Sequence, residues 1–367
     1  MNISNILKLN IPHLDPHSLE KISIVSHAHG DHVAYNPYSE QRTIICSKET
    51  AEIIKHRSKE TKLNTIRLDY GIKYNLVDLL NTHTSDSSNI SSDSDISFSK
   101  DVFITLYPAG HILGSSQILI ETHESSLLYS GDFKLRESLS CPKLEIPNIS
   151  TIVNKRIEYL IMESTFGKPK YVFPDKKKVA KNIADFCNQS LDENLFPILL
   201  TYSLGKSQEI ISLLKEYKFR IIVHESIFKI CKIYQKFEGY EKLESILGNY
   251  EQYTKNLLSS ESLKDRTVLI IPPQYNKTRI VTSIPNRKTA VISGWAIDSS
   301  AKYIYKADEA FPISDHADYK ELIEYAKAIN ARKTFITHGF ALPLSKDLNL
   351  LGIDAEPLSD YSNTGLF

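Results

Sequence analysis

The sequence predicts an α/β protein in which strands and helices alternate along the chain and pack in layers. Short runs of β-branched and apolar residues recur, and many are apolar on both faces, as expected for buried strands. Helical patterns lie between several of these runs, an alternation typical of α/β architectures. The composition excludes a disordered chain, because 41% of the 367 residues are hydrophobic and 44 basic residues balance 44 acidic ones.

The predicted elements follow from these local patterns. Strands are expected at Ile22–Ser26, Val102–Leu106, Gln117–Glu121, Leu127–Ser130, Tyr159–Met162, Pro197–Leu200, Arg220–Val223, Thr267–Ile271, Thr289–Ile292 and Lys333–Thr337. Helices are expected at Lys176–Gln189, Lys206–Tyr217, Ile227–Phe237 and Tyr319–Ile329. The segment Thr82–Lys100 is dense in Ser, Asp and Asn, and we expect a solvated loop that extends a hairpin.

Several classes of protein are excluded or disfavoured. The four cysteines are far apart and form no C-x-x-C pair, so neither a disulfide framework nor a thiolate metal site is predicted. No apolar run approaches the roughly 18 residues of a membrane span, and the N-terminal segment lacks a signal-peptide core. We therefore expect a cytoplasmic protein without a membrane partner. The zero net charge removes the overall basic field of a nucleic-acid coat protein, but an enzyme can still concentrate positive charge in one cleft.

The sharpest chemical signal is the segment Ser26-His27-Ala28-His29-Gly30-Asp31-His32, which directly follows a predicted strand. Imidazole and carboxylate are the ligands that zinc and similar divalent metals accept. His111, Asp132 and His338 each follow a later strand and each adjoin a glycine. Loops at one edge of a sheet can converge, so these residues are expected to form one metal site. A single strand-end histidine is more often structural, and the prediction therefore depends on the whole set.

These motifs resemble those of a known family. H-x-H-x-D-H at 27–32, Gly110-His111 and Ser130-Gly131-Asp132 resemble the ligand pattern of the metallo-β-lactamase fold. Three later motifs, at 162–167, 313–318 and 337–339, resemble motifs A, B and C of the β-CASP nucleases. Together with the stretch from Pro108 to Gln117, the resemblance covers nearly the whole chain. It implies an αββα metallo-β-lactamase sandwich from residues 1–166 and 312–367, with an inserted β-CASP α/β domain at 167–311.

The resemblance also implies a set of ligands for two divalent metal ions, with zinc favoured and manganese as the second choice. One ion would be held by His27, His29 and His111, the other by Asp31, His32 and His338, with Asp132 bridging them. Asp15 resembles the early aspartate of the superfamily and would hydrogen-bond ligand histidines, which fixes their tautomers. Two such ions would lower the pKa of a shared water, and Asp31 is accordingly predicted to be essential for hydrolysis.

Further residues are candidates for proton transfer and substrate binding. His316 would protonate the leaving oxygen as a general acid, and Glu163 would hold it in its charged form. The alternative is that this segment only caps the following helix, through Ser314 or Asp315.

Lys206 and Ser207 open a predicted helix within Tyr202–Gln208, where backbone amides and side chains suit a substrate phosphate. An ordinary strand-to-helix turn is the alternative for this segment.

The expected function is metal-dependent hydrolysis of phosphodiester bonds. The compact layout and the spellings YSLGKSQ, SGW and FPISDHADY resemble the bacterial ligase-associated DNA exonucleases. We therefore expect a DNA exonuclease that acts in DNA repair with an ATP-dependent DNA ligase and a helicase. The histidine of motif C is associated with RNA-type enzymes, so a β-CASP ribonuclease of the RNA 3′-end processing or RNA decay type is the alternative. A non-catalytic scaffold is disfavoured because no metal ligand is missing.

Overall fold

The computed structural model describes residues 6, 11–16, 20–33, 42–58, 63–84, 98, 101–148, 156–237, 249–254 and 266–358. The chain divides into two compact units. The first comprises Met1–Glu137, Pro142–Lys170 and Ala317–Phe367, and the second comprises Ser138–Cys141 and Tyr171–His316. The predicted domain boundaries, after residues 166 and 311, lie a few residues before the points at which the units change. The short segment Ser138–Cys141, which belongs to the second unit, was not anticipated.

The first unit contains two sheets. The strands of the larger sheet are, in spatial order, β17 (Ala355–Pro357), β16 (Lys333–Thr337), β9 (Tyr159–Glu163), β8 (Ser126–Tyr129), β7 (Ser116–Glu121), β6 (Phe103–Pro108) and β5 (Lys73–Asn75). Strands β5 to β8 are antiparallel neighbours, whereas β8, β9, β16 and β17 run parallel. The smaller sheet is parallel throughout and contains β1 (His13–Leu14), β2 (Ile22–Ile24), β3 (Arg42–Ser47) and β4 (Leu63–Leu68).

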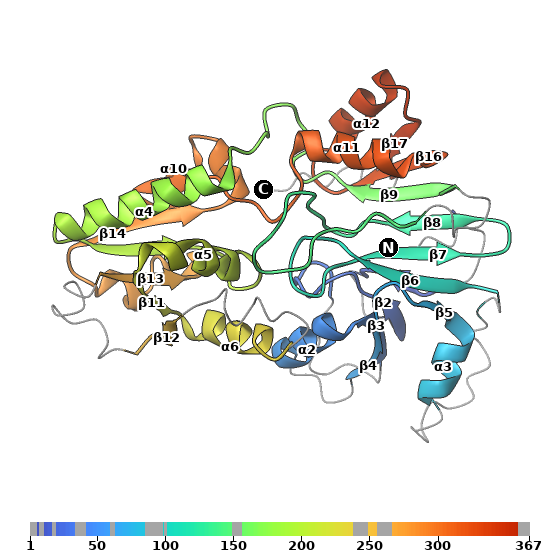
Figure 1. Ribbon diagram of the computed structural model, residues 1–367, viewed down its shortest axis with the longest axis horizontal. Coiled ribbons are helices and arrows are strands. Elements are labelled where there is room, and N and C mark those ends of the chain that lie inside the picture. Colours follow the sequence, from blue (N-terminus) through green and yellow to red (C-terminus); the bar gives the residue numbers. More distant parts are fainter. Residues whose placement is uncertain are drawn as a thin grey trace. The chain divides into compact units, whose positions relative to one another are not determined.

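Helices cover the outer faces of these two sheets (Figure 1). Helix α2 (Lys48–Arg57) packs on β3 and β4, and α12 (Ala341–Leu350) packs on β16 and β17. Helix α11 (Tyr319–Ile329) shares the apolar core on the same side of the larger sheet, and α3 (Leu76–Thr84) follows β5. In β7, Ile118 and Ile120 contribute to the core between the sheets, whereas Leu119 contributes to the core under the helices. This alternation gives four layers in the order helix, sheet, sheet, helix.

The second unit has one six-stranded parallel sheet. Its strands are, in spatial order, β12 (Tyr250–Gln252), β11 (Arg220–Val223), β13 (Thr267–Ile271), β10 (Phe196–Leu200), β14 (Arg287–Ile292) and β15 (Glu309–Phe311). The accompanying helices are α4 (Lys176–Asp192), α5 (Lys206–Leu214), α6 (Glu225–Tyr234), α9 (Arg279–Thr282) and α10 (Ala301–Tyr305), with 3-10 turns η3 (Lys215–Tyr217), η6 (Pro273–Tyr275) and η7 (Gly294–Ile297). Apolar strand residues such as Ile198, Leu200 and Leu269 form its core.

The α/β class and the predicted elements are confirmed, with ends that differ by a few residues. The predicted helix Lys206–Tyr217 consists of α5 followed by the 3-10 turn η3. Helices α2 and α12 and strands β3 and β4 were not predicted. Helix α2 follows β3 without an intervening loop, because Ser47 ends the strand and also accepts the Thr50 amide as the helix N-cap. Most of the Ser- and Asp-rich segment lies outside the described residues, and its first residues complete α3.

None of the helices in the described part of the chain combines the length and the apolar character that crossing a membrane requires.

Candidate metal centre

The seven candidate ligands lie in loops that follow four strands of the first unit. The loop after β2 carries His27, His29, Asp31 and His32, the loop after β6 carries His111, that after β8 carries Asp132, and that after β16 carries His338. Strands β6 and β8 both run antiparallel to β7, and β8, β9 and β16 are parallel. The loops after β6, β8 and β16 therefore all lie at the same end of the strands of the larger sheet.

Three histidines and one aspartate bring one donor atom each to a common place. Nδ1 of His29 lies 3.1 Å from Nε2 of His27 and 3.0 Å from Nε2 of His111. Oδ2 of Asp132 lies 3.5 Å from Nε2 of His27 and 3.7 Å from Nε2 of His111. All four atoms lie within 4.8 Å of one another, and three of the four side chains are buried.

These separations suit a tetrahedral metal ion. Zinc–nitrogen bonds of about 2.0–2.1 Å at tetrahedral angles separate neighbouring donors by ~3.3 Å. Hydrogen bonds alone account poorly for the cluster, because Nδ1 of His29 approaches two imidazole nitrogens but has only one N–H or one lone pair to offer them. The residues present therefore fit an ion of the zinc type, held by His27, His29, His111 and Asp132.

Asp132 also approaches the second predicted set of ligands. Its Oδ2 lies 3.3 Å from Nε2 of His32, and the same nitrogen lies 3.7 Å from Oδ2 of Asp31. The ring centroids of His32 and His338 are 5.6 Å apart. Asp31 is exposed, whereas His32 is buried, so this side of the cluster is more open to solvent than the first. Asp132 thus lies next to both sets, the position that a bridging ligand needs.

Asp15 is a buried carboxylate that accepts hydrogen bonds around this cluster. Its Oδ1 accepts the backbone amide of Ser26 at 2.7 Å, and its Oδ2 accepts the hydroxyls of Ser26 at 2.5 Å and Tyr129 at 2.8 Å. Nδ1 of His32 lies 2.8 Å from the same Oδ2. Because an ionised carboxylate only accepts, the shared proton belongs to Nδ1 of His32, and Nε2 is the nitrogen that offers a lone pair to a metal once the ring is neutral.

Ser26 extends this arrangement to a second ligand. Nδ1 of His27 lies 3.0 Å from Oγ of Ser26. Since that hydroxyl donates its proton to Asp15, it accepts from Nδ1 of His27, and Nε2 of His27 is again the nitrogen available to a metal. Sequence reasoning missed Ser26 and Tyr129. The only signal in the sequence was that each adjoins a motif, Ser26 before His27 and Tyr129 before Ser130.

Gly131 allows the loop after β8 to approach Ser26. Its φ is +54°, and a β-carbon at this position would lie 2.8 Å from Cβ of Ser26. Any larger residue would be strained and would displace the serine that links His27 to Asp15. Gly131, beside Asp132, therefore leaves room for Ser26, which in turn orients His27 in the neighbouring loop.

The histidines differ in whether their surroundings favour the neutral or the charged ring. Burial first, and then the positive charge of His32, lower the pKa of His27 well below its usual value. Burial also disfavours the charged form of His32, but the carboxylates of Asp132 and Asp15 outweigh it and raise the pKa of His32 well above its usual value. Burial lowers the pKa of His338. His27 and His338 are thus ready to bind a metal as neutral rings, whereas His32 must first lose a proton.

Glu163 and Ala317, the residue after His316, both form hydrogen bonds with the backbone of Phe133 in the first unit. Oε1 of Glu163, the last residue of β9, accepts the amide of Phe133 at 2.9 Å. The amide of Ala317, which directly follows His316, donates to the carbonyl of Phe133 at 2.6 Å. His316 itself is the last residue of the second unit, and its amide donates to Oγ of Ser314 at 3.0 Å.

The suggestion that Ser314 or Asp315 caps the helix after motif B is wrong. The N-cap of α11 is Asp318, whose side chain accepts the amides of Lys320 at 2.9 Å and Glu321 at 3.0 Å. Asp318 immediately precedes the first helical residue, and only from that position does a short carboxylate reach these unpaired amides. Ser314 and Asp315 lie too early in the chain for this role.

Lys206 and Ser207 are both buried and both have partners within the second unit. Nζ of Lys206 lies 2.9 Å from Oδ2 of Asp315, and Oγ of Ser207 donates to the carbonyl of Tyr202 at 2.6 Å. Their contact with a substrate phosphate stays a prediction. The structure adds a connection that the sequence did not indicate, an ion pair between the start of α5 and the residue before His316.

A cluster of histidines and aspartates at the strand ends of a layered α/β unit is typical of proteins that bind metal ions. Comparisons with known proteins indicate which family of such proteins the chain resembles. No protein-family profile matches the chain. The chain is 35% identical over 343 residues to a probable DNA ligase of Opitutus terrae. The matched region covers 93% of this chain and 29% of that protein. It is 23% identical over 386 residues to an RNase J-like protein of Methanocaldococcus jannaschii, which covers 93% of this chain and 88% of that protein.

A third relative is the endoribonuclease YSH1 of Kluyveromyces lactis, 23% identical over 420 residues, covering 96% of this chain and 53% of the relative. These relatives fit the β-CASP family of metallo-β-lactamase-fold nucleases, which the motifs of the chain resemble. It spans less than a third of the length of the ligase-named relative and about half of the endoribonuclease.

Proposed function

We propose that this chain is a metal-dependent nuclease that hydrolyses phosphodiester bonds. The observation that carries the proposal is the convergence of one donor atom each from His27, His29, His111 and Asp132. Two divalent ions, zinc in preference to manganese, would when bound supply a water of low pKa and neutralise charge on the phosphate.

The proposed ligand sets follow the two sides of the cluster. The first ion would be held by His27, His29 and His111, the second by Asp31, His32 and His338, with Asp132 between them. Asp15 orients His32 directly and His27 through Ser26. A complete set of ligands with this supporting network is unnecessary in a scaffold protein, and this favours an enzyme.

His316 is the proposed general acid. Its imidazolium would donate a proton to the leaving oxygen, and the Glu163 carboxylate would hold the ring charged and in place. The support is that Glu163 and Ala317, the neighbour of His316, both hydrogen-bond the backbone of Phe133. The hydrogen bond from Ala317 to Phe133 fixes the backbone to which His316 is attached.

Residues 167–311, most of the second unit, are the proposed inserted β-CASP domain, which would take part in binding nucleic acid. Its six-stranded parallel sheet and crossover helices form a core of their own.

DNA is the proposed substrate, and the proposed reaction is exonucleolytic. A sequence similar to nearly all of this chain occurs within a protein named for DNA ligase. That supports a nuclease that processes DNA ends in repair, with an ATP-dependent DNA ligase and a helicase as partners. The alternative is a ribonuclease, and it is favoured by the names of the RNase J-like and endoribonuclease relatives and by His338 in motif C.

Hydrolysis of end-labelled nucleic acids separates these two substrates. Single- and double-stranded DNA and RNA of one sequence are incubated with the chain and zinc or manganese, with Asp132→Ala as the inactive control. DNA exonuclease activity yields mononucleotides with a 5′-phosphate and leaves RNA largely intact. If RNA is degraded far faster than DNA, the ribonuclease alternative replaces the proposal.

A further inference from the structure

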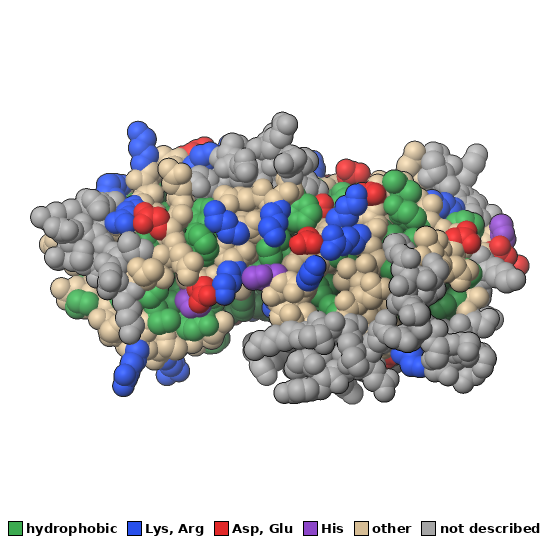
Figure 2. Space-filling model, turned by 90° about the horizontal axis from the view of Figure 1, so that it is seen from below, with side chains coloured by type: hydrophobic (Ala, Val, Ile, Leu, Met, Phe, Trp, Pro, Cys, Tyr) green, Lys and Arg blue, Asp and Glu red, His purple; other side chains and the backbone are tan. Residues whose placement is uncertain are grey.

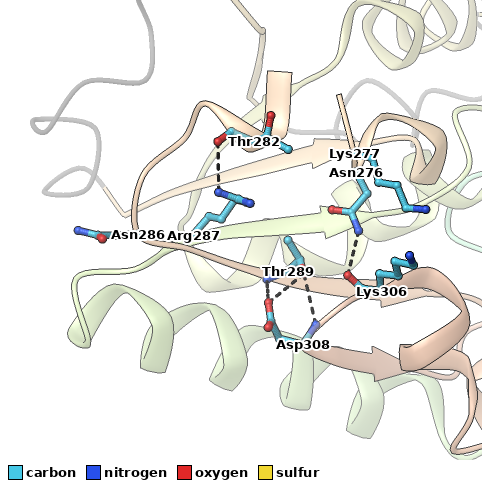
Figure 3. A pocket seen from close by; sticks show the side chains of 8 residues that line it. All are labelled: Asn276, Lys277, Thr282, Asn286, Arg287, Thr289, Lys306 and Asp308. Carbon is cyan, nitrogen blue, oxygen red and sulfur yellow. Dashed lines mark hydrogen bonds between the residues drawn. The ribbon is translucent and has the colours of Figure 1, made fainter. Parts of the chain in front are cut away.

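The second unit contains a polar pocket that the proposed hydrolysis does not use (Figure 3). The pocket is a cavity of about 520 Å³ at the amino-terminal end of β14. Its walls come from the residues after η6, from α9, and from the turn between α10 and β15. Cavities of roughly 300–1,000 Å³ are typical of sites for small molecules.

The charge of the lining is strongly asymmetric. Lys277, Lys306 and Arg287 are exposed in the cavity, and none of them has an ion-pair partner among the residues that the structure describes. The single carboxylate is Asp308, whose Oδ2 accepts the amide and the hydroxyl of Thr289 at 2.7 and 2.9 Å. The lining therefore has an excess of two positive charges in a chain whose net charge is zero.

The two lysines are neighbours without an intervening carboxylate. Lys306, which lines the same pocket, lowers the pKa of Lys277. Two cations in one pocket repel each other, and an anion bound between them relieves the repulsion. On the face drawn in Figure 2, by contrast, Lys and Arg side chains are interspersed with Asp and Glu.

Hydrogen bonds hold the backbone that carries these cations. Nδ2 of Asn276 donates to the carbonyls of Tyr305 at 3.0 Å and Lys306 at 3.1 Å, which ties the segment of Lys277 to the turn of Lys306. Nη1 of Arg287 donates to the carbonyl of Ile284 at 3.0 Å. The backbone that carries the two lysines and the guanidinium of Arg287 are thus held before a ligand arrives, which reduces the entropic cost of binding.

We propose that this pocket binds a phosphate group, supplied by a mononucleotide or by a nucleic-acid strand. Phosphate oxygens accept charge-assisted hydrogen bonds from several donors at once, and Lys and Arg are their usual partners. The proposal does not require the metal centre, because the pocket belongs wholly to the second unit.

Binding of phosphate ligands to the full chain in a chelator, without divalent metal, tests this proposal. Calorimetry is carried out with inorganic phosphate, dAMP and a single-stranded oligonucleotide. The test variant is Lys277→Gln with Lys306→Gln, and the control is Lys215→Gln with Lys218→Gln, two exposed lysines of the same unit. Asp308→Asn removes the negative charge and can still accept from Thr289. Circular dichroism and thermal melting establish that each variant is folded.

We expect the double variant to bind phosphate about tenfold more weakly, the control to match the parent, and Asp308→Asn to bind a few-fold more tightly. If the strand supplies the phosphate, the double variant also weakens oligonucleotide binding, with a salt slope that falls by about 0.7 per lost contact. An effect confined to phosphate and dAMP identifies a mononucleotide site. Phosphate binding that is absent from the parent, or equal in parent and double variant, overturns the proposal.

Discussion

At the scale of single residues, Asp15 determines which nitrogen atoms of two candidate ligand histidines face the proposed metal centre. It accepts from Nδ1 of His32 directly and from His27 through the hydroxyl of Ser26. Nε2 of each ring then lies beside Asp132, with a lone pair on His27 and, once its ring has lost a proton, on His32. Partners of this kind typically change metal affinity by one or two orders of magnitude.

Asp15→Asn is therefore expected to lower zinc affinity by about 10- to 100-fold while the chain stays folded. The amide keeps the size of the side chain, but one of its ends donates and cannot accept from Ser26, Tyr129 or His32. Competition with a chromophoric chelator measures the affinity. Asp101→Asn, at an exposed carboxylate of the same unit, is the control. Equal zinc affinities for Asp15→Asn and the parent would show that Asp15 does not orient the ligands.

His316→Ala should lower turnover of DNA by about a hundredfold or more, the usual contribution of a general acid, while metal content stays at the parent level. A nitrophenyl phosphodiester has a good leaving group that needs little protonation, so its hydrolysis should be far less affected. Glu163→Gln should cause a smaller loss on DNA. Equal slowing of both substrates by His316→Ala, or loss of metal, would assign His316 a structural role.

At the scale of elements, the sequence predicted which strands precede the candidate ligands, but it did not predict which residues hydrogen-bond to them. Runs such as Thr267–Ile271 are buried at every position, and their short length and β-branched residues favour a strand over a helix. The bond from Tyr129 to Asp15 joins residues 114 positions apart, and that from Lys206 to Asp315 joins residues 109 apart. Such pairs depend on tertiary packing, and no local pattern in one sequence indicates them.

The ion pair between Lys206 and Asp315 is expected to stabilise the start of α5 and the loop before His316. Both side chains are buried and the charged atoms are 2.9 Å apart, so Lys206→Met removes the positive charge that Lys206 places beside a buried carboxylate. The expected loss in the free energy of unfolding is about 3–5 kcal/mol. Urea denaturation measures it, and Lys181→Met, which breaks the exposed pair with Asp185, should have little effect.

Lys206→Met combined with Asp315→Leu should recover part of that stability, because neither charge then remains buried alone. The predicted phosphate contact leads to a different result, a loss of substrate affinity with unchanged stability. Stability equal to the parent in Lys206→Met would therefore favour the phosphate role over the structural one.

At the scale of the whole molecule, all the predicted metal ligands belong to the first unit, whereas the phosphate-binding pocket belongs to the second. The sequence indicated the α/β class. It gave no sign of the pocket, because Lys277, Arg287 and Lys306 come from separate segments. Chemistry and the recognition of phosphate can thus be tested independently.

The most direct test of the metal-centre proposal is hydrolysis of end-labelled single-stranded DNA by the chain before and after its metal is removed. We predict that the stripped chain is inactive and that zinc or manganese restores hydrolysis as the metal content rises to as many as two ions per chain. Asp132→Ala should stay folded, bind less metal and remain inactive. Hydrolysis of DNA at an undiminished rate by a chain that contains no divalent metal would contradict the account.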